Sequence, residues 1–415
     1  MDLVHFDFVN IIFRDNSIKL FNQKISIIAL LSTVFCVTTV GLDNIDLKQL
    51  RGKNVAIVAN HTSIDSKETH ILDILSQISD IAVDVVFAPE HGFKGNLSAG
   101  AFFDDAITPI YKIVSLYGKN KAPKKEDLLN IDVIIFDIQD IGSRYYTYIS
   151  TLTYVMEAAA NFNIPLIVLD RPNPLGRLVD GPLLNMEYAS FVGMHPIPIR
   201  HGMTIGEIAL MIAGEGWLKS NNKLDLELVK LEGWNVEMGY FSIPPSPNIP
   251  NHVTSLIYNG MCLLEGTNLS EGRGTETPFL LFGAPWLNGY KLTSILNKLK
   301  LPGIKFEYSM FKPVRIRGKA DWPKYRDKMC QGVKIKVLNM DKVEPIRMAV
   351  HIIDEIRALH PDEFVFLETN FIDKLYGNES LKLNILSHES LENLFLSWQE
   401  DKTRFSSIRK QYLLY

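Results

Sequence analysis

The 415-residue sequence predicts an α/β protein with a Rossmann-like, doubly wound, mostly parallel sheet and a second, smaller α+β domain at the C-terminus. Three observations predict this fold class. Short apolar runs alternate with helix-periodic segments after about residue 45. These runs are apolar throughout, as in strands that are buried on both faces. Lys and Arg become more frequent after about residue 290, which indicates the second domain. The expected parts are a leader-like segment at 1–44, a catalytic domain at 45–288 and the smaller domain at 289–415.

The first half of the chain supplies the expected parallel sheet. Strands joined by helices through right-handed crossovers build a doubly wound layer. Thr204 begins a helix, with Glu207 three residues later in capping-box spacing. Residues 224–231 alternate polar and apolar side chains, which indicates a strand at a sheet edge. The other expected strands are 54–59, 83–88, 132–136 and 165–169, and the other expected helices are 66–79 and 145–161.

The second half of the chain is predicted to be more mixed. Residues 244–285 are rich in Pro, Gly, Asn and Ser, and such a composition indicates an irregular segment. Short strands and longer helices then alternate less regularly than before, as in an α+β domain. The expected strands are 314–317 and 332–338, and the expected helices are 343–359 and 391–398.

The N-terminus has the pattern of a signal peptide. Lys19 and Lys24 precede a mainly apolar run at 25–37, which is shorter than the about 20 residues of a membrane-spanning helix. The sequence therefore predicts an exported protein, periplasmic or extracellular, without an integral membrane span. Cys36 raises the alternative of a lipoprotein, although residues 33–35 fit that motif poorly. A buried first strand or helix is the other interpretation.

Charge and cysteine usage exclude several classes of protein. The net charge is −4 and the pI about 6.2, so no basic excess points to nucleic acid or to an anionic membrane surface. The three cysteines are Cys36, Cys262 and Cys330, and they form no CxxC pair that would bind zinc. Free buried thiols are expected rather than a disulfide.

Polar clusters follow each of the first four expected strands. In an open parallel sheet, ligands bind beyond the carboxyl ends of the strands, so these clusters are expected along one rim. No GxxxxGK[ST] or GxGxxG pattern accompanies them, and no cofactor is predicted. The clusters lie at 60–62, 89–93, 137–145 and 170–174, and further polar segments lie at 200–204, 245–248 and 265–275.

Glu90 is the residue best placed to donate a proton. It follows a buried strand between Pro89 and Gly92, and a carboxylic acid in a partly closed site suits general-acid chemistry such as glycoside cleavage. His91, Asp137 and Asp140 are the other candidate catalytic residues. The candidate substrate-binding residues are Asn60, Gln139, Arg144, Tyr145, Asp170, Arg171, Asn173, His201, Asn248, Glu265, Asn268, Glu271 and Arg273.

Each candidate also has a purely structural interpretation. Glu90 could cap a helix or pair with an Arg, and Asp137 and Asp140 could shape their loop. An Arg can hold a substrate carboxylate with two hydrogen bonds or brace a loop carboxylate instead. His61, His91 and His201 could meet around a metal ion, but no HxH or HExxH spacing supports this, and no metal is predicted.

Long motifs resemble those of one known family. They read PEHGFKG, DVIIFDIQDIGSRYYTYISTL, VLDRPNPLGRLVDGP, PIRHGMTIGEIA, PSPNIP and LLEGTNLSEGRGTETPFLLFGAPW. The chain resembles the NamZ-like exo-β-N-acetylmuramidases from about Val40 to Tyr415. The resemblance implies a Rossmann-like domain, a smaller C-terminal domain and a site in the cleft between them, with the glutamate of the EHGF motif, here Glu90, as the proposed catalytic acid.

The resemblance implies release of N-acetylmuramic acid from the non-reducing end of peptidoglycan fragments, with muramyl saccharides as the partners. The substrate's 2-acetamido group could act as the nucleophile, or Asp137 or Asp140 could act as a base on water. Arg144 or Arg171 is expected to bind the lactyl carboxylate. A metal-dependent hydrolase or amidase of cell-wall material and a non-catalytic peptidoglycan-binding protein are the alternative functions.

Overall fold

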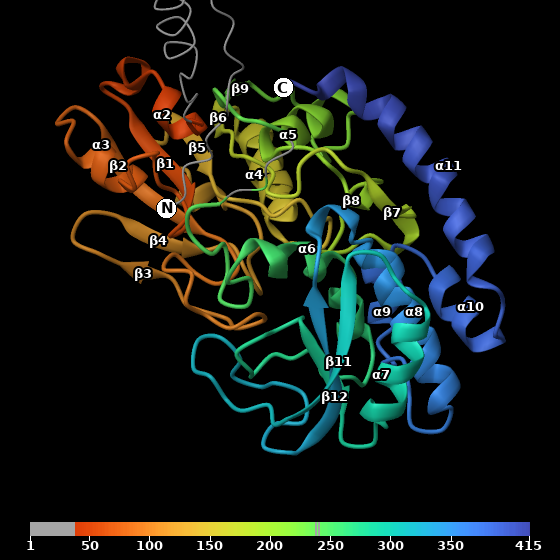
Figure 1. Cartoon of the computed structure of the whole chain (residues 1–415). Helices are drawn as coiled ribbons and strands as arrows, with labels where there is room; N and C mark the ends of the chain where they lie inside the picture. Colours follow the sequence, from red (N-terminus) through yellow and green to blue (C-terminus); the bar gives the residue numbers. More distant parts are fainter. Residues whose placement is uncertain (1–37, 237–238, 240) are drawn as a thin grey trace, which may run out of the picture. The chain divides into compact units, whose positions relative to one another are not determined.

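The computed structural model describes residues 38–415 except 237, 238 and 240 (Figure 1). Residues 38–415 form one compact unit. The predicted apolar leader run at 25–37 lies outside the described residues. Residues 38–44, which the prediction also assigned to the leader, belong to the folded unit, because α2 (Gly41–Asn44) packs with Leu42 buried. No helix in the described part of the chain is long and apolar enough to cross a membrane.

A seven-stranded sheet forms the centre of the fold, in the order β3-β4-β2-β1-β5-β6-β9. All neighbouring pairs are parallel except β3 with β4. The predicted fold class, a mostly parallel Rossmann-like sheet with helices, is therefore confirmed. The strands are β1 (Asn54–Ala59), β2 (Ala82–Ala88), β3 (Ala106–Ile107), β4 (Lys112–Ser115), β5 (Val133–Asp137), β6 (Leu166–Leu169) and β9 (Leu226–Val229).

Both faces of this sheet are covered, which explains why its central strands are apolar throughout. Successive side chains of a strand point to opposite faces. On β1, Val55 and Ile57 pack into one apolar cluster with α3 (Ile71–Ser76), and Ala56 and Val58 pack into another with α4 (Tyr148–Phe162) and α5 (Ile205–Gly214). The Thr204–Glu207 capping box begins α5 as predicted.

A three-stranded antiparallel sheet, ordered β10-β12-β11, lies in the C-terminal half. Its strands are β10 (Leu281–Ala284), β12 (Cys330–Val337) and β11 (Ile304–Phe311), and α7 (Gly289–Lys298) packs on it. The predicted division at residue 288 stays a prediction, and β10, which precedes it, belongs to this sheet. The remaining elements are β7 (Asp180–Leu183), β8 (Pro198–Arg200), α6 (His252–Met261), α8 (Pro345–Leu359), α9 (Phe371–Tyr376), α10 (Ser380–Ser387) and α11 (Leu391–Arg409).

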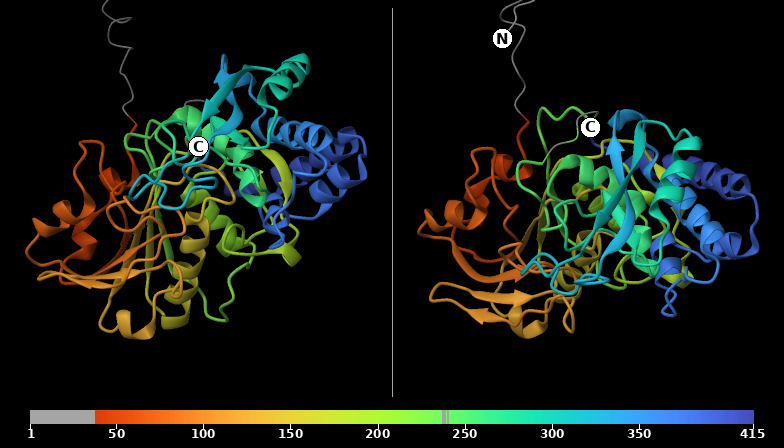
Figure 2. Two further views of the ribbon diagram at one scale, coloured as in Figure 1. Left: turned by 90° about the horizontal axis from the view of Figure 1, so that it is seen from below. Right: turned by 60° about the horizontal axis from the view of Figure 1, so that its bottom comes forward.

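The end of the chain returns to the first sheet. Helix α11 packs against β7, and both views of Figure 2 show the C-terminus away from the blue helices, near the middle of the molecule. The hydroxyl of Tyr415 donates to Asp170 Oδ2 at 2.8 Å and accepts from the Leu231 amide at 2.9 Å. The two halves of the chain are thus tied together at the sheet as well as through α6 and α8.

Some element predictions were wrong. Residues 244–285 are irregular only in part, because Asn251 caps α6 by accepting from the Thr254 amide, and β10 also falls in this segment. No strand forms at 314–317, where the chain turns and Ile316 bridges Ala320. The strand β11 was missed, although its residues alternate between exposed and covered positions. The expected helix at 66–79 is confined to α3.

Candidate active site

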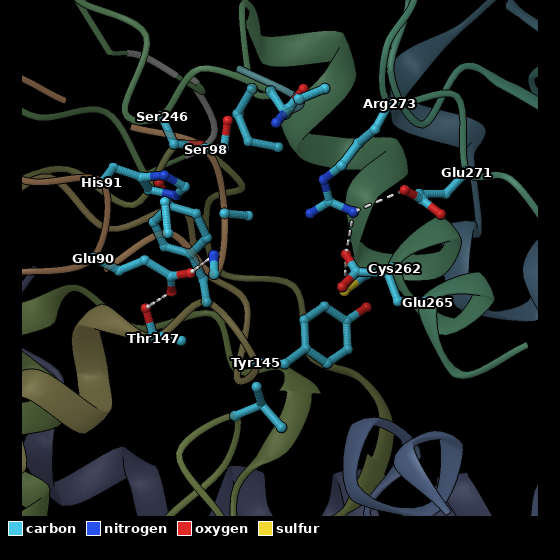
Figure 3. A pocket seen from close by; sticks show the side chains of 18 of the residues that line it. Glu90, His91, Ser98, Tyr145, Thr147, Ser246, Cys262, Glu265, Glu271 and Arg273 are labelled. Atoms are coloured by element: carbon cyan, nitrogen blue, oxygen red, sulfur yellow. Dashed lines mark hydrogen bonds and ion pairs between the residues drawn. The ribbon is translucent and has the colours of Figure 1, made fainter. Parts of the chain in front are cut away.

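A cavity of about 930 Å³ opens where the strand-end loops of the parallel sheet meet the C-terminal half. Figure 3 shows Glu90 and His91 on one side of it and Arg273, Glu271 and Glu265 on the other. Loops from both halves of the chain therefore build one site. Its lining comes from residues 90–102, 117–121, 145–147, 191–192, 246–249, 258–279 and 319–324, with 371 and 375.

Glu90 lies in the wall of this cavity with only 8% of its surface exposed. Its Oε1 accepts a hydrogen bond from the Gly100 amide at 3.0 Å, and its Oε2 accepts one from the Thr147 hydroxyl at 2.8 Å. Both carboxyl oxygens are thus held in place by donors from two different segments. The carboxyl group is fixed toward the cavity, as a proton-transferring group has to be.

The chain turns sharply directly after Glu90. His91 has a left-handed backbone with φ of 73°, and its Nδ1 lies 2.8 Å from the Leu97 carbonyl oxygen. Burial lowers the pKa of His91, against the opposing charge of Glu90, and the charge of Arg273 lowers it further. His91 therefore contributes a neutral, fixed imidazole to the wall beside Glu90.

The opposite wall carries a cluster of two carboxylates and two cations. Arg273 Nη1 donates to Glu265 Oε1 at 2.7 Å and to Glu271 Oε1 at 3.2 Å. Lys324 Nζ lies 3.5 Å from Glu271 Oε2 and also donates to four backbone carbonyls between residues 264 and 269. Burial opposes ionisation of Glu271, but Lys324 and Arg273 outweigh it and lower its pKa. Glu271 is thus an anion held between two cations.

One nitrogen of the Arg273 guanidinium, Nη2, takes no part in these ion pairs and faces the cavity. Both ion pairs use Nη1, and Nε has no hydrogen-bond partner among the described residues. The guanidinium packs over Phe279 at 4.8 Å from the ring centroid and points into the cavity (Figure 3). Nε is buried, so Nη2 is the nitrogen that is left to donate to a ligand carboxylate in the cavity.

Aromatic side chains line the mouth of the cavity. Tyr117 packs between Phe102 and Phe191, with ring centroids 6.0 and 5.9 Å away, and Lys121 lies 4.8 Å over the Phe191 ring. Burial and the neighbouring Glu90 carboxyl raise the pKa of Tyr117 above its usual value. Trp322, with 83% of its surface exposed, lies on the C-terminal side of the lining. Such faces can stack on sugar rings.

Seven of the sequence-predicted site residues line the cavity. Tyr145 lies at its floor, with its hydroxyl bonded to the Asn259 carbonyl. Asn248 donates to the Lys319 carbonyl at 2.7 Å, while its buried Oδ1 has no partner in the part of the chain that the structure describes. The lining residues are Glu90, His91, Tyr145, Asn248, Glu265, Glu271 and Arg273.

Asp137 and Arg171 lie outside the cavity lining and pair with each other. Arg171 donates from Nε to Asp137 Oδ1 at 2.5 Å and from Nη2 to Asp137 Oδ2 at 2.8 Å, and both side chains are buried. Burial raises the pKa of Asp137, and the Arg171 charge opposes that rise. The pair braces the loops beneath the site, so neither residue meets a ligand in this cavity.

Arg144 is likewise a scaffold residue. It is buried and donates to the carbonyls of Pro182, Ile197, Leu375 and Tyr376 at 2.8–2.9 Å. Burial lowers its pKa to about 10. Nη1 and Nη2 therefore join β7, the residue before β8 and α9, and the predicted contact with a substrate carboxylate does not fit this geometry.

The other predicted residues also serve the loops around the cavity. Asp140 accepts from the Gly142 amide at 2.6 Å, and His201 Nε2 lies 3.8 Å from its carboxylate. Burial raises the pKa of Asp170 to about 6, and its carboxyl joins Thr204 and Tyr415. Internal hydrogen bonds hold the remaining predicted residues, which are Asn60, Gln139, Asn173 and Asn268.

Several lining residues were not predicted. Thr147 lies within the segment that was singled out and two residues from Tyr145, so the motif carried a signal for it. Ser98 belongs to a Ser-Ala-Gly motif of the resemblance, whereas Lys324 and Asp321 had no local signal, because their roles depend on contacts between distant segments. The two described cysteines, Cys262 and Cys330, are free and buried. Within residues 38–415, as far as they are described, no group of three His, Cys, Asp or Glu side chains is arranged for a metal ion.

Comparisons with known proteins point to one family. The model of the N-terminal part of exo-β-N-acetylmuramidase NamZ matches residues 55–253, and the model of its C-terminal part matches residues 256–415. Peptidoglycan β-N-acetylmuramidase NamZ of Bacillus subtilis is 41% identical over 379 residues, which cover 89% of this chain and 88% of that protein.

Solved structures share the fold. Two crystal structures of DUF1343 family proteins from Bacteroides fragilis are similar to this chain, with TM-scores of 0.81 and 0.75 at 33% and 34% identity. Each comparison covers 91% of this chain and 99% of the solved chain. The similarity therefore includes both the parallel sheet and the C-terminal half that completes the cavity.

Proposed function

Because the chain belongs to the NamZ family of exo-β-N-acetylmuramidases, we propose that it is a glycosidase that releases N-acetylmuramic acid from the non-reducing end of peptidoglycan fragments. Glu90 is the general acid in this proposal. One observation carries it: a buried carboxyl, held through both oxygens, faces a cavity large enough for a sugar. Such a group can protonate the oxygen of the leaving sugar.

The second catalytic group comes from the substrate or from the opposite wall. Asp137 and Asp140 lie outside the cavity lining, which removes the support for either as a base on water. Glu265 and Glu271 face Glu90 across the cavity, and both are paired with Arg273. The substrate's own 2-acetamido group is the alternative nucleophile. In either case the Glu265 and Glu271 carboxylates lie where they can stabilise positive charge that develops on the sugar ring.

Arg273, rather than Arg144 or Arg171, is the residue that we propose to bind the lactyl carboxylate. It is the arginine on the cavity lining, and neither of its ion pairs uses Nη2. The carboxylate would meet Nη2, while Glu265 and Glu271 keep Nη1 in place. Lys324 offsets part of the negative charge gathered there.

We propose export for the same protein. Peptidoglycan lies outside the cytoplasmic membrane, and the signal-like run at 25–37 would direct the chain there.

The activity is tested with two disaccharides of opposite order. Incubation with N-acetylmuramyl-β-1,4-N-acetylglucosamine should release free N-acetylmuramic acid, and N-acetylglucosaminyl-β-1,4-N-acetylmuramic acid should remain intact. Proton NMR of the first-formed anomer reports the stereochemistry. Retention fits a nucleophile from the substrate or from Glu265 or Glu271, and inversion fits a base on water. Equal cleavage of both disaccharides would contradict the exo-muramidase proposal.

Arg273→Gln should remove the enzyme's preference for a charged lactyl group. A hydrogen-bonded charge pair contributes about 1.5–3 kcal/mol. The native enzyme should therefore cleave the disaccharide with a free lactyl carboxylate about 10–100-fold better, in kcat/KM, than the same disaccharide with a lactyl amide. The variant should cleave the two nearly equally. Comparing two substrates on each enzyme cancels any general damage from the lost contacts with Glu265 and Glu271.

Lys121→Met is the matched control, since it removes another cation from the cavity lining. It should keep the preference for the carboxylate. Loss of the preference in Lys121→Met, with retention in Arg273→Gln, would assign carboxylate recognition to the mouth of the cavity instead.

A further inference from the structure

The Gly100 amide reaches Glu90 from a tight turn. The Ala101 amide donates to the Ser98 carbonyl at 3.0 Å, which closes a turn over residues 98–101. Gly100 occupies its third position with φ of 76°, as in a type II turn, where glycine is favoured. The direction of the Gly100 amide, and so its 3.0 Å bond to Glu90 Oε1, depends on how this turn is held.

Asp321, from the C-terminal half, holds the first residue of that turn. The Ser98 hydroxyl donates a hydrogen bond to Asp321 Oδ2 at 2.7 Å. The same hydroxyl oxygen accepts a hydrogen bond from the Asp321 backbone amide at 3.2 Å. Ser98 is 6% exposed, so this contact is largely shielded from water. Two segments that are 223 residues apart in the chain are thereby joined at the cavity wall.

The loop that carries Asp321 is itself well braced. Arg315 Nε donates to Asp321 Oδ1 at 3.0 Å, and the Gly318 amide lies 3.4 Å from Oδ2. Gly318 has φ of 73°, and a Cβ there would lie 2.2 Å from the Asn96 carbonyl oxygen, so the two loops touch through backbone. Ser98 and Arg315 lower the pKa of Asp321, which is therefore an anion.

We propose that Asp321 is a positioning residue for the general acid: through Ser98 it fixes the turn that presents the Gly100 amide to Glu90. The inference rests on the proposed role of Glu90. The Gly100 amide holds one of the two carboxyl oxygens, so the bond influences where the proton donor lies. The C-terminal loop thus acts on the acid without touching it.

Asp321→Ala and Ser98→Ala each break this connection. Each should lower kcat for the muramyl-glucosamine disaccharide roughly tenfold and leave KM nearly unchanged, as expected from losing one hydrogen bond that positions the proton donor. The double variant should be no worse than either single variant, because both substitutions interrupt the same path.

Asp341→Ala is the matched control, because Asp341 is exposed and is not part of the cavity lining. It should leave kcat and KM unchanged. Unchanged kcat in the single variants, a change in KM alone, or additive losses in the double variant would overturn the positioning role. If Asp321→Ala does not fold, Ser98→Ala decides alone. A fully active Glu90→Gln variant would instead overturn the proposed function, so the two failures are distinguishable.

Discussion

Glu90→Gln should lower kcat for release of N-acetylmuramic acid from the muramyl-glucosamine disaccharide by about 10²–10⁴-fold. The amide keeps the size of the side chain and can still accept from the Gly100 amide or the Thr147 hydroxyl, but it has no proton to give to the leaving sugar. Substrate binding should change little, so the loss should fall on kcat rather than KM. Steady-state kinetics with the disaccharide measure it.

The leaving group separates loss of the acid from general damage. The leaving group of a nitrophenyl muramide is nitrophenolate, which departs without needing a proton. Glu90→Gln should therefore lose far less activity on this substrate than on the disaccharide. Glu126→Gln, at an exposed position, is the control and should behave like the native enzyme on both substrates. Equal losses on the two substrates would mean that Glu90 does not act as the proton donor.

The strand ends explain why the sequence predicted the site only in part. The four polar clusters do follow parallel strands, and their position predicted the rim correctly. Distance beyond the strand does not decide the role by itself, because Arg171 lies two residues beyond β6 and is buried against Asp137. Asn60 and Asp170 come directly after β1 and β6, Asp137 is the last residue of β5, and all three are fully buried between loops. Glu90 lies two residues beyond β2, where the chain has left the sheet and the side chain can face the cavity.

The opposite wall could not be predicted in the same way. Residues 265–273 were singled out for their composition, but what they face depends on the packing of the two halves of the chain. Lys324 is one lysine among many in the sequence, and its function arises from four carbonyls and a carboxylate that come together only in the fold. Periodicity and motif reading are local, whereas this wall is made by long-range contacts.

Arg171→Met should destabilise the protein by about 3–5 kcal/mol at neutral pH. The substitution leaves the Asp137 carboxylate fully buried without its partner, and it also removes the donor to the Ile64 carbonyl at 2.9 Å. A buried charge without a partner is costly because no water replaces the lost hydrogen bonds. Chemical denaturation of the native protein and the variant, compared through the free energy of unfolding, measures the effect.

The double variant Asp137→Leu with Arg171→Met identifies the cause. Replacing both members of a buried ion pair by apolar residues is often close to neutral, so the double variant should be more stable than Arg171→Met alone. Because neither residue lines the cavity, it should also retain muramidase activity at temperatures where it is folded. A folded but inactive double variant would return Asp137 to the list of catalytic residues.

The pH dependence gives an independent check on the same pair. Burial already raises the pKa of Asp137 in the folded state, and loss of Arg171 removes the charge that opposes this rise. A carboxyl whose pKa is higher in the folded than in the unfolded state favours folding at low pH, and that contribution is lost as pH rises above the unfolded value of about 4. The penalty of Arg171→Met should therefore be small near pH 4 and grow toward neutrality, whereas a penalty independent of pH would mean that lost packing, not the unpaired carboxylate, is responsible.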